Sequence, residues 1–202
     1  MAAILLTLAG CSRYAGNDIE IGVLEDRETS RNCKVFIVSE SRMADIAKVV
    51  SVWEENRKAL FDNLEFNENR HRQLLEDIAD ARTDIVKANI LDSPNLKILG
   101  EFKLRTSKAY AEECEFEIIN DKGKIFEAYA KFLDTLSDVL SDAAIGQKRT
   151  DMSGVAKFSG IVEQRVVIFA LPSADSKLQY GYSKLNVTEQ RKQILELKTL
   201  FL

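Results

Sequence analysis

Glu68 and His71 have a Glu-x-x-His spacing, which places both side chains on one face of a helix. Di-iron helical bundles use two such pairs together with two further carboxylates. The chain contains one His, so it supplies neither a second pair nor the two histidines of His-rich zinc sites. A Ser-His-Asp triad would need only His71, but no Gly-x-Ser-x-Gly sequence, P-loop or Gly-x-Gly-x-x-Gly loop accompanies it. We therefore expect no enzyme activity, no metal and no other cofactor.

The first eleven residues, MAAILLTLAGC, join a short apolar run to a Cys. Ala2 to Gly10 carries no charge and is too short to cross a bilayer, which takes about 20 apolar residues. Its length is that of the apolar part of a secretory signal. Leu8-Ala9-Gly10-Cys11 resembles the lipobox of bacterial lipoproteins, and the resemblance covers these eleven positions only.

The resemblance implies that residues 1–10 are a signal removed before Cys11, whose thiol receives a diacylglycerol and whose amine receives an acyl chain such as palmitate. Two or three acyl chains anchor stably, because each buried CH₂ contributes about 0.8 kcal/mol. Ser12 implies, as in enterobacteria, a place on the periplasmic side of the outer membrane. Met1-Ala2-Ala3 lacks the Lys or Arg of most signals. The alternative is an apolar segment packed on the body, with Cys11 a buried thiol.

Cys33 and Cys114 would then be two unmodified cysteines in an oxidising compartment. A disulfide between them would close a loop of about 80 residues and stabilise the fold by about 4 kcal/mol in the chain-entropy model. The alternative is two separate buried thiols. Because the sequence has no Cys-x-x-Cys pair and no Cys/His cluster, a redox or zinc role has little support.

Composition and charge limit the fold and the partners. Hydrophobic residues make up 46% of the 202 residues, which is enough for a buried core. The formal net charge of −4 gives no general attraction to nucleic acid, so we expect no nucleic-acid partner. Two Pro and nine Gly favour long helices over a turn-rich all-β fold.

A seven-residue spacing predicts one very long helix over about residues 40–91. Eleven of the 14 a/d positions between Met43 and Ala88 are apolar, and the register holds without a break. About 50 residues at ~1.5 Å each would give a rod of roughly 75 Å. The polar seam positions are Arg57, Asn67 and His71, which we interpret as residues that specify a partner helix or its alignment.

Further helices are predicted after the long one. Asp92-Ser93-Pro94 ends the long helix and begins the next, with Pro94 at the first helical position. For residues 95–119 we favour a helix that runs back along the first, with a β-hairpin as the alternative. Amphipathic patterns indicate helices over 124–145, near 152–170 and after Thr188.

The sequence therefore predicts a mainly α fold, an elongated antiparallel helical bundle. It divides into a lipoprotein signal segment (1–10), a lipidated N-terminus and tether (11–38) and a helical bundle domain (39–202). The function that fits is a non-enzymatic outer-membrane lipoprotein. Anchored in the membrane by its acyl chains, it would act as a helical binding or scaffolding module for a protein partner or a second copy.

Three other functions fit parts of the sequence. A membrane-perturbing or pore-forming helical protein could use the apolar run from Val166 to Leu171. A cytosolic helical interaction protein fits if residues 1–11 are not a signal. An enzyme acting through His71 would lose its activity when His71 is replaced by Ala, whereas a seam residue would affect only stability or assembly.

Overall fold

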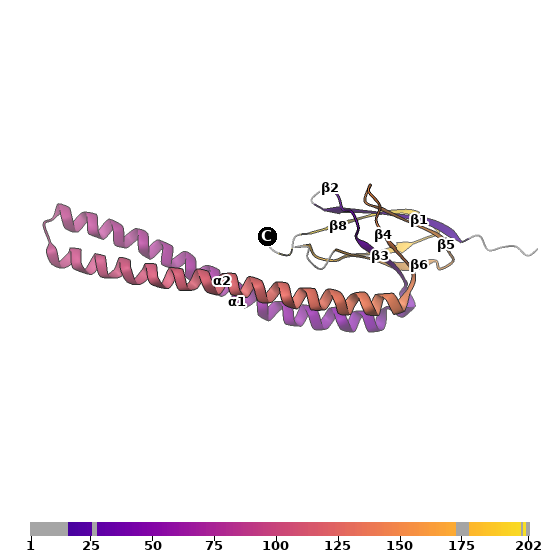
Figure 1. Ribbon diagram of the computed structural model, residues 1–202, viewed down its shortest axis with the longest axis horizontal. Coiled ribbons are helices and arrows are strands. Elements are labelled where there is room, and N and C mark those ends of the chain that lie inside the picture. The colour runs from indigo at the N-terminus through magenta and orange to yellow at the C-terminus, as the bar shows by residue number, and fades with distance from the viewer. Residues whose placement is uncertain (1–15, 26–27, 173–177, 199, 201–202) are drawn as a thin grey trace, which may run out of the picture. The chain divides into compact units, whose positions relative to one another are not determined.

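The computed structural model describes residues 16–25, 28–172, 178–198 and 200 (Figure 1). These residues form two long helices and eight strands, and the strands make two sheets. The chain divides into two compact units. One consists of the chain up to Ala47 together with the chain from Thr135 onward, and the other is Lys48–Asp134. The first unit is a β-sandwich, and the second is a helical hairpin.

The first sheet of the sandwich, sheet A, is built around β1 (Asn17–Glu25). Antiparallel β5 (Val155–Ile161) pairs with residues 17–22 of β1, and the two-residue β2 (Glu28–Thr29) pairs with its end. On the other edge of β1, β8 (Lys192–Leu197) runs parallel to it. β1 is therefore hydrogen-bonded on both edges.

The second sheet, sheet B, has the order β4-β3-β6-β7, with antiparallel pairs throughout. Its strands are β3 (Lys34–Ser39), β4 (Ala144–Arg149), β6 (Arg165–Leu171) and β7 (Gly181–Asn186). The chain leaves β3 through a short 3-10 helix, Glu40–Arg42, runs through both long helices and returns in β4. Because β3 and β4 are paired, the inserted helices begin and end on neighbouring strands.

The core of the sandwich collects alternate residues from strands of both sheets. The inward side chains of β1 and β6 are at most 1% exposed: Ile19, Ile21, Val23, Val166, Ile168 and Ala170. This alternation with a period of two is the pattern of a strand with one face in a core. It places the outer residues of β1, such as Glu20 and Gly22, on the open face of sheet A.

Sheet B is buried on its other face as well. Phe36 of β3 and Phe169 of β6 are register partners on that face, and both are at most 1% exposed. On the same face, the Lys34 Nζ donates a hydrogen bond of 3.1 Å to the Ser137 Oγ. The last turns of the second long helix, which belong to the same unit, therefore lie over this face.

The two helices are α1 (Met43–Ile90) and α2 (Pro94–Ala143). The long helix predicted over about 40–91 is confirmed, and so is the helix over 95–119 in place of a hairpin. The separate helix predicted over 124–145 is instead the continuation of α2. Among the described residues, neither helix contains a stretch long and apolar enough to span a bilayer.

The predicted mainly α fold, an elongated antiparallel helical bundle, is wrong, because the chain forms strands before α1 and again after α2. Residues 152–170 form β5 and most of β6 instead of a helix, and the segment after Thr188 forms β8. The described residues of the segment 11–38, expected to be the lipidated N-terminus and tether, contribute β1, β2 and nearly all of β3, which ends at Ser39. β6 misled the prediction because a strand buried on both faces reads as a continuous apolar run, and such a run has no period to tell strand from helix.

Candidate functional site

The hairpin unit is a two-helix coiled coil with the register that the sequence predicts. Within this unit, every predicted seam position of α1 from Val50 to Ala88 is buried or half-buried. α2 supplies a second seven-residue series, at Gly100, Ser107 and Cys114, together with a series at Leu104, Ala111 and Ile118. Sequence reasoning missed the α2 series because several of its members are small or polar and give no hydrophobic signal.

The half of the hairpin away from its turn is held by aromatic rings. Trp53 of α1 lies 5.2 Å from Tyr129 and 5.0 Å from Phe132 of α2, measured between ring centroids. Both the Trp53 and the Tyr129 side chains are buried. Trp53 is the only Trp of the chain, so its fluorescence reports on this unit.

Arg57 lies half-buried at its seam position but makes its contacts within α1. Its guanidinium is 3.5 Å from the Glu54 carboxylate and 5.2 Å from the centroid of the Phe61 ring. Among the contacts that the structure gives for Arg57, none reaches α2. Its predicted role in specifying the partner helix is therefore not carried by these contacts.

Asn67 does join the two helices, in a polar layer across the seam. Its side-chain Nδ2 donates to the Asp121 Oδ2 at 2.8 Å, and its backbone carbonyl oxygen accepts from the Cys114 thiol at 3.2 Å. The Lys124 Nζ donates to the other Asp121 oxygen at 2.9 Å. Hydrogen bonds, first from Lys124 and then from Asn67, hold the pKa of Asp121 below its usual range.

Ion pairs flank this layer, and His71 follows it on the seam. Arg70 pairs with Glu117 at 3.5 Å and Lys122 pairs with Glu68 at 3.1 Å, both across the helices. His71 is half-buried one turn after Asn67. These contacts join the two helices on both sides of the seam, and the role of Asn67 and His71 in specifying the alignment of α1 and α2 stays a prediction.

The two described cysteines are separate free thiols, so the candidate disulfide between Cys33 and Cys114 is not formed. Cys33 belongs to the sandwich, where its sulfur shares a 3.1 Å hydrogen bond with the Ser30 Oγ. Cys114 belongs to the hairpin seam. Burial raises the pKa of both thiols, which keeps them protonated and weakly nucleophilic. Cys11 lies outside the described residues.

The other half of the hairpin, toward the turn, has a seam of small residues. Ala81 and Ala88 of α1 and Gly100, Ser107 and Ala111 of α2 are all buried there. A Cβ added at Gly100 would lie 2.8 Å from the Ile85 Cγ1, so the helices approach too closely for a larger side chain. Apart from the half-buried Ile85 and Leu104, the large apolar side chains nearest the turn are excluded from the seam.

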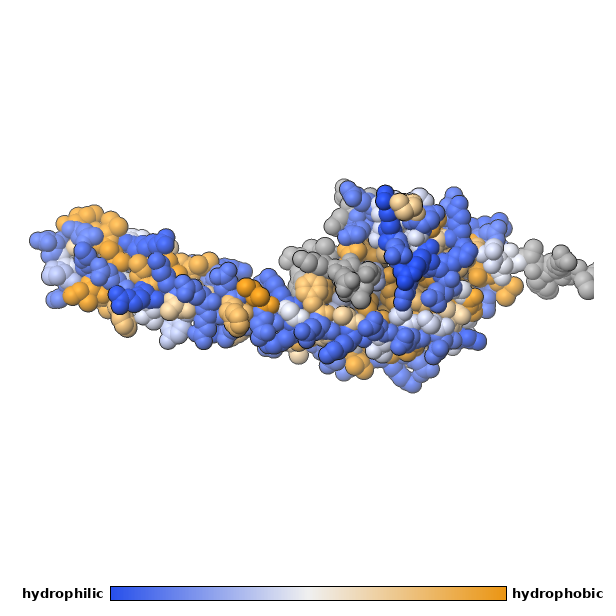
Figure 2. All heavy atoms as spheres, in the orientation of Figure 1, coloured by the Kyte–Doolittle hydropathy of each residue, from blue (hydrophilic) through white to orange (hydrophobic). Residues whose placement is uncertain are grey.

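These excluded side chains form an exposed apolar surface, which we call the tip patch. Its members are each at least half exposed: Val86, Ile90, Leu91, Leu96, Ile98, Leu99 and Phe102. Figure 2 shows hydrophobic residues gathered at the end of the hairpin where α1 and α2 are joined. A dense group of large exposed apolar residues on a protein surface usually marks a contact site.

The tip also differs in charge from the rest of the chain. Residues 86–108, the tip segment, carry five Lys or Arg and two Asp or Glu, for a net charge of +3, whereas the whole chain has −4. Further along α2 the sign reverses, because Glu112, Glu113, Glu115 and Glu117 follow within ten residues. The apolar residues of the tip are thus interspersed with cations.

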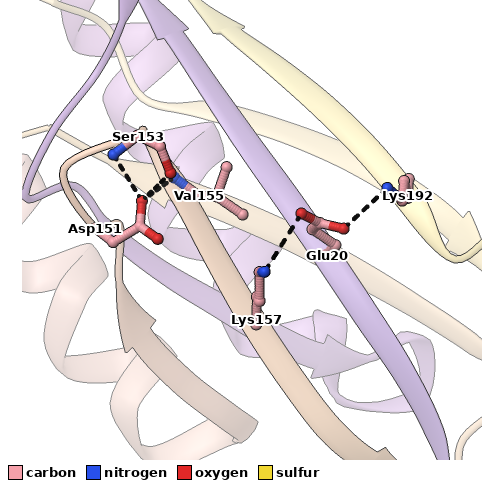
Figure 3. A network of polar contacts seen from close by, with 6 residues as sticks. All are labelled: Glu20, Asp151, Ser153, Val155, Lys157 and Lys192. Carbon is pink, nitrogen blue, oxygen red and sulfur yellow. Dashed lines mark hydrogen bonds and ion pairs between the residues drawn. The ribbon is translucent and has the colours of Figure 1, made fainter.

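Sheet A presents a different kind of surface, in which charges are paired (Figure 3). Glu20 of β1 lies between Lys157 and Lys192 of the neighbouring strands, at 3.9 and 3.1 Å. A depression of about 370 Å³ beside it is lined by residues that include Lys148, Arg191 and Asp18. Glu20 and Asp18 offset only two of the four cations that line this depression, but none of its lining residues is an exposed large apolar side chain, so we rank it below the tip.

Comparisons with protein-family models, with curated proteins and with solved structures give no match for this chain. Within the described part of the chain, no group of three or more His, Cys, Asp or Glu side chains could hold a metal ion. The tip segment is therefore the candidate functional site on the geometry alone.

Proposed function

We propose that this chain is a non-enzymatic lipoprotein of the bacterial cell envelope, anchored through Cys11 on the periplasmic side of the outer membrane. Its helical hairpin acts as a binding module, and the tip segment is its contact surface. The single observation that carries the binding role is the tip patch. Apolar side chains there are exposed, such as Ile90 (78%) and Phe102 (68%). A partner that covers them removes apolar surface from water, which contributes favourably to the free energy of binding.

The build of the hairpin supports this role. The aromatic cluster and the Asn67–Asp121 layer hold the two helices in one register, so the tip is presented on a defined support. The 48 residues of α1 extend about 72 Å at ~1.5 Å per residue. The exposed apolar residues at the turn therefore lie a full helix length away from Met43, where α1 begins.

The location rests on the lipobox resemblance of Leu8-Ala9-Gly10-Cys11, in residues outside the described part of the chain. The absence of catalysis is part of the same proposal. It is supported by the protonated state of the buried Cys33 and Cys114 thiols and by the seam position of His71. The raised pKa values of Cys33 and Cys114 disfavour a thiolate nucleophile, and His71 is half-buried in the helix seam.

The test uses the full chain, expressed from its own start in a Gram-negative host with a photoreactive phenylalanine analogue at position 102. The matched control carries the analogue at position 116, because Phe116 lies on the same helix and is 72% exposed. We expect cross-links to protein or lipid from position 102 only. We expect the membrane-extracted protein to have the intact mass of a chain that begins at Cys11 and carries two or three acyl groups.

The binding role of the tip and the lipid anchor can each be contradicted by a separate outcome. Equal cross-linking from positions 102 and 116 would remove the binding role of the tip. An unmodified full-length mass in the soluble fraction would remove the lipid anchor, and a cytosolic interaction protein would then be the better description.

A further inference from the structure

We propose that the outer face of α2 between Ile98 and Tyr110 binds the surface of a lipid bilayer that carries anionic headgroups. This inference rests on the proposed function, since it names the partner of the tip segment. It concerns binding at the interface, with the hairpin lying on the headgroup layer.

Exposed apolar residues form a strip along one side of α2. At about 100° per residue, Ile98 and Phe102 lie opposite the seam residues Gly100 and Ser107. Leu99 and, three turns after it, Tyr110 lie on the flank between this side and the seam. The four side chains are between 49% and 68% exposed. They form a convex apolar strip, which suits a fluid surface that can close around it.

Cations outnumber anions along the borders of the strip. Lys103 lies along one border, and Arg105 and Lys108 lie along the other with Glu101 between them. An apolar face bordered by Lys and Arg on both sides is the pattern of helices that lie in a membrane interface, because the long stems reach up to the headgroups while the apolar face is immersed. The tip segment has a net charge of +3 within a chain of −4, so anionic lipid attracts the tip selectively.

The turn decides how the hairpin meets the bilayer. The turn carries the apolar Leu91 but also the polar Asp92 and Ser93, and the Asp92 carboxylate is exposed there. An end-on approach would immerse this carboxylate first, at a high cost in desolvation. A side-on approach immerses the α2 strip and leaves the turn at the level of the headgroups.

Charge also argues against a second copy as the occupant of this face. Two tip segments brought together would each present a net charge of +3, and like charges at a contact repel. An anionic bilayer supplies the opposite sign over a continuous area. The Glu-rich part of α2 after residue 111 limits the contact to the tip, since it would be repelled by the same lipids.

The experiment measures sedimentation of the chain from Ser12 onward, which keeps every described residue, with vesicles. One set is phosphatidylcholine alone, and the other contains 30% phosphatidylglycerol. We expect binding to the anionic vesicles only, and we expect 0.5 M NaCl to weaken it. Phe102→Ser and Ile98→Ser should each lower the partition coefficient about tenfold. Lys103→Ala and Arg105→Ala should each lower it about fivefold.

Phe116→Ser is the matched control, because Phe116 lies on the outer side of the same helix between Glu115 and Glu117. It should change the partition coefficient less than twofold. All of these side chains are exposed, so each variant should keep the helical circular dichroism and the Trp53 fluorescence of the parent. If both signals are unchanged, a lower partition coefficient reflects weaker membrane binding and not unfolding of the variant.

The outcomes separate the inference from the proposed function. No binding to anionic vesicles, or an equal loss in Phe116→Ser and Phe102→Ser, overturns the inference. If the chain does not sediment with anionic vesicles but position 102 cross-links to a protein in cells, the tip is a protein-docking surface. Only the inference is then wrong. If both fail, both proposals are wrong.

Discussion

The β-sandwich and the hairpin bury their apolar residues in different ways. Sheet B is covered on both faces, so Phe36 and Ile37, adjacent in β3, are both fully buried. In the hairpin each helix has one described neighbour, and near the turn the seam is filled largely by small residues such as Ala88 and Gly100. Phe102 and Ile98 are therefore left exposed. The large apolar residues of the sandwich therefore stabilise its fold, whereas those of the tip stay exposed, and the proposed contact surface rests on that exposure.

The same substitution in the two regions gives the largest expected contrast. Ile168→Ala removes a fully buried side chain from the sandwich core and should lower the free energy of unfolding by about 2–5 kcal/mol. Ile98→Ala removes a side chain that is 65% exposed and should change it by less than ~0.5 kcal/mol. Thermal unfolding followed by calorimetry measures both. Equal losses in the two variants would mean that the tip patch is covered by the chain itself.

Two glycines of α2 sharpen the contrast within the hairpin. Gly100→Leu must push the helices apart against Ile85 and should destabilise the hairpin by about 1–3 kcal/mol. Gly123→Ala meets nothing within 4 Å and should stabilise it by about 0.5–1 kcal/mol, because Ala restricts the unfolded chain. The midpoint of the circular dichroism transition at 222 nm tests both. A stabilising Gly100→Leu would show that the seam near the turn is not closely packed.

The predictions from sequence succeeded where a long period repeats and failed where elements are short. The seam of α1 repeats over twelve turns or so, and no single polar residue such as Asn67 or His71 can hide it. β1 carries its signal in three alternate residues, Ile19, Ile21 and Val23, among Asp, Glu and Gly. β6 lacks even that alternation, since its second face is covered by residues distant in the sequence.

The candidate site was missed for a related reason. The apolar residues of the tip, such as Ile98 and Phe102, fit an amphipathic helix whose apolar side is buried. Only the structure shows that Gly100, Ser107 and Ala111 occupy the seam instead. The excess of cations over residues 86–108 was readable from the sequence, and together with the apolar residues it could have pointed to the tip.

The smallest expected effect is the contribution of single carboxylates to the free energy of unfolding as the pH falls. Asp121 of the hairpin and Asp151 of the sandwich are compared. Hydrogen bonds lower the pKa of Asp121 in the hairpin, chiefly from Lys124, and of Asp151 in the sandwich turn, chiefly from Ser153 (Figure 3). A lowered pKa in the folded state means that the carboxylate stabilises above its unfolded pKa, and that this contribution is lost as the pH falls through the folded pKa.

Asp121→Asn should therefore weaken the hairpin by a few tenths of a kcal/mol at pH 7 and by less at pH 2, because the parent carboxylate loses its charge as the pH falls through its folded pKa. Urea unfolding followed by Trp53 fluorescence measures this difference. Asp151→Asn is the control: its carboxylate accepts hydrogen bonds from the Ser153 and Val155 backbone and from the Ser153 hydroxyl, all in a turn of the sandwich. It should leave the Trp53 transition unchanged at both pH values. If Asp151→Asn shifted that transition as much as Asp121→Asn, the two units would unfold together, and the stability of the hairpin could not be separated from that of the sandwich.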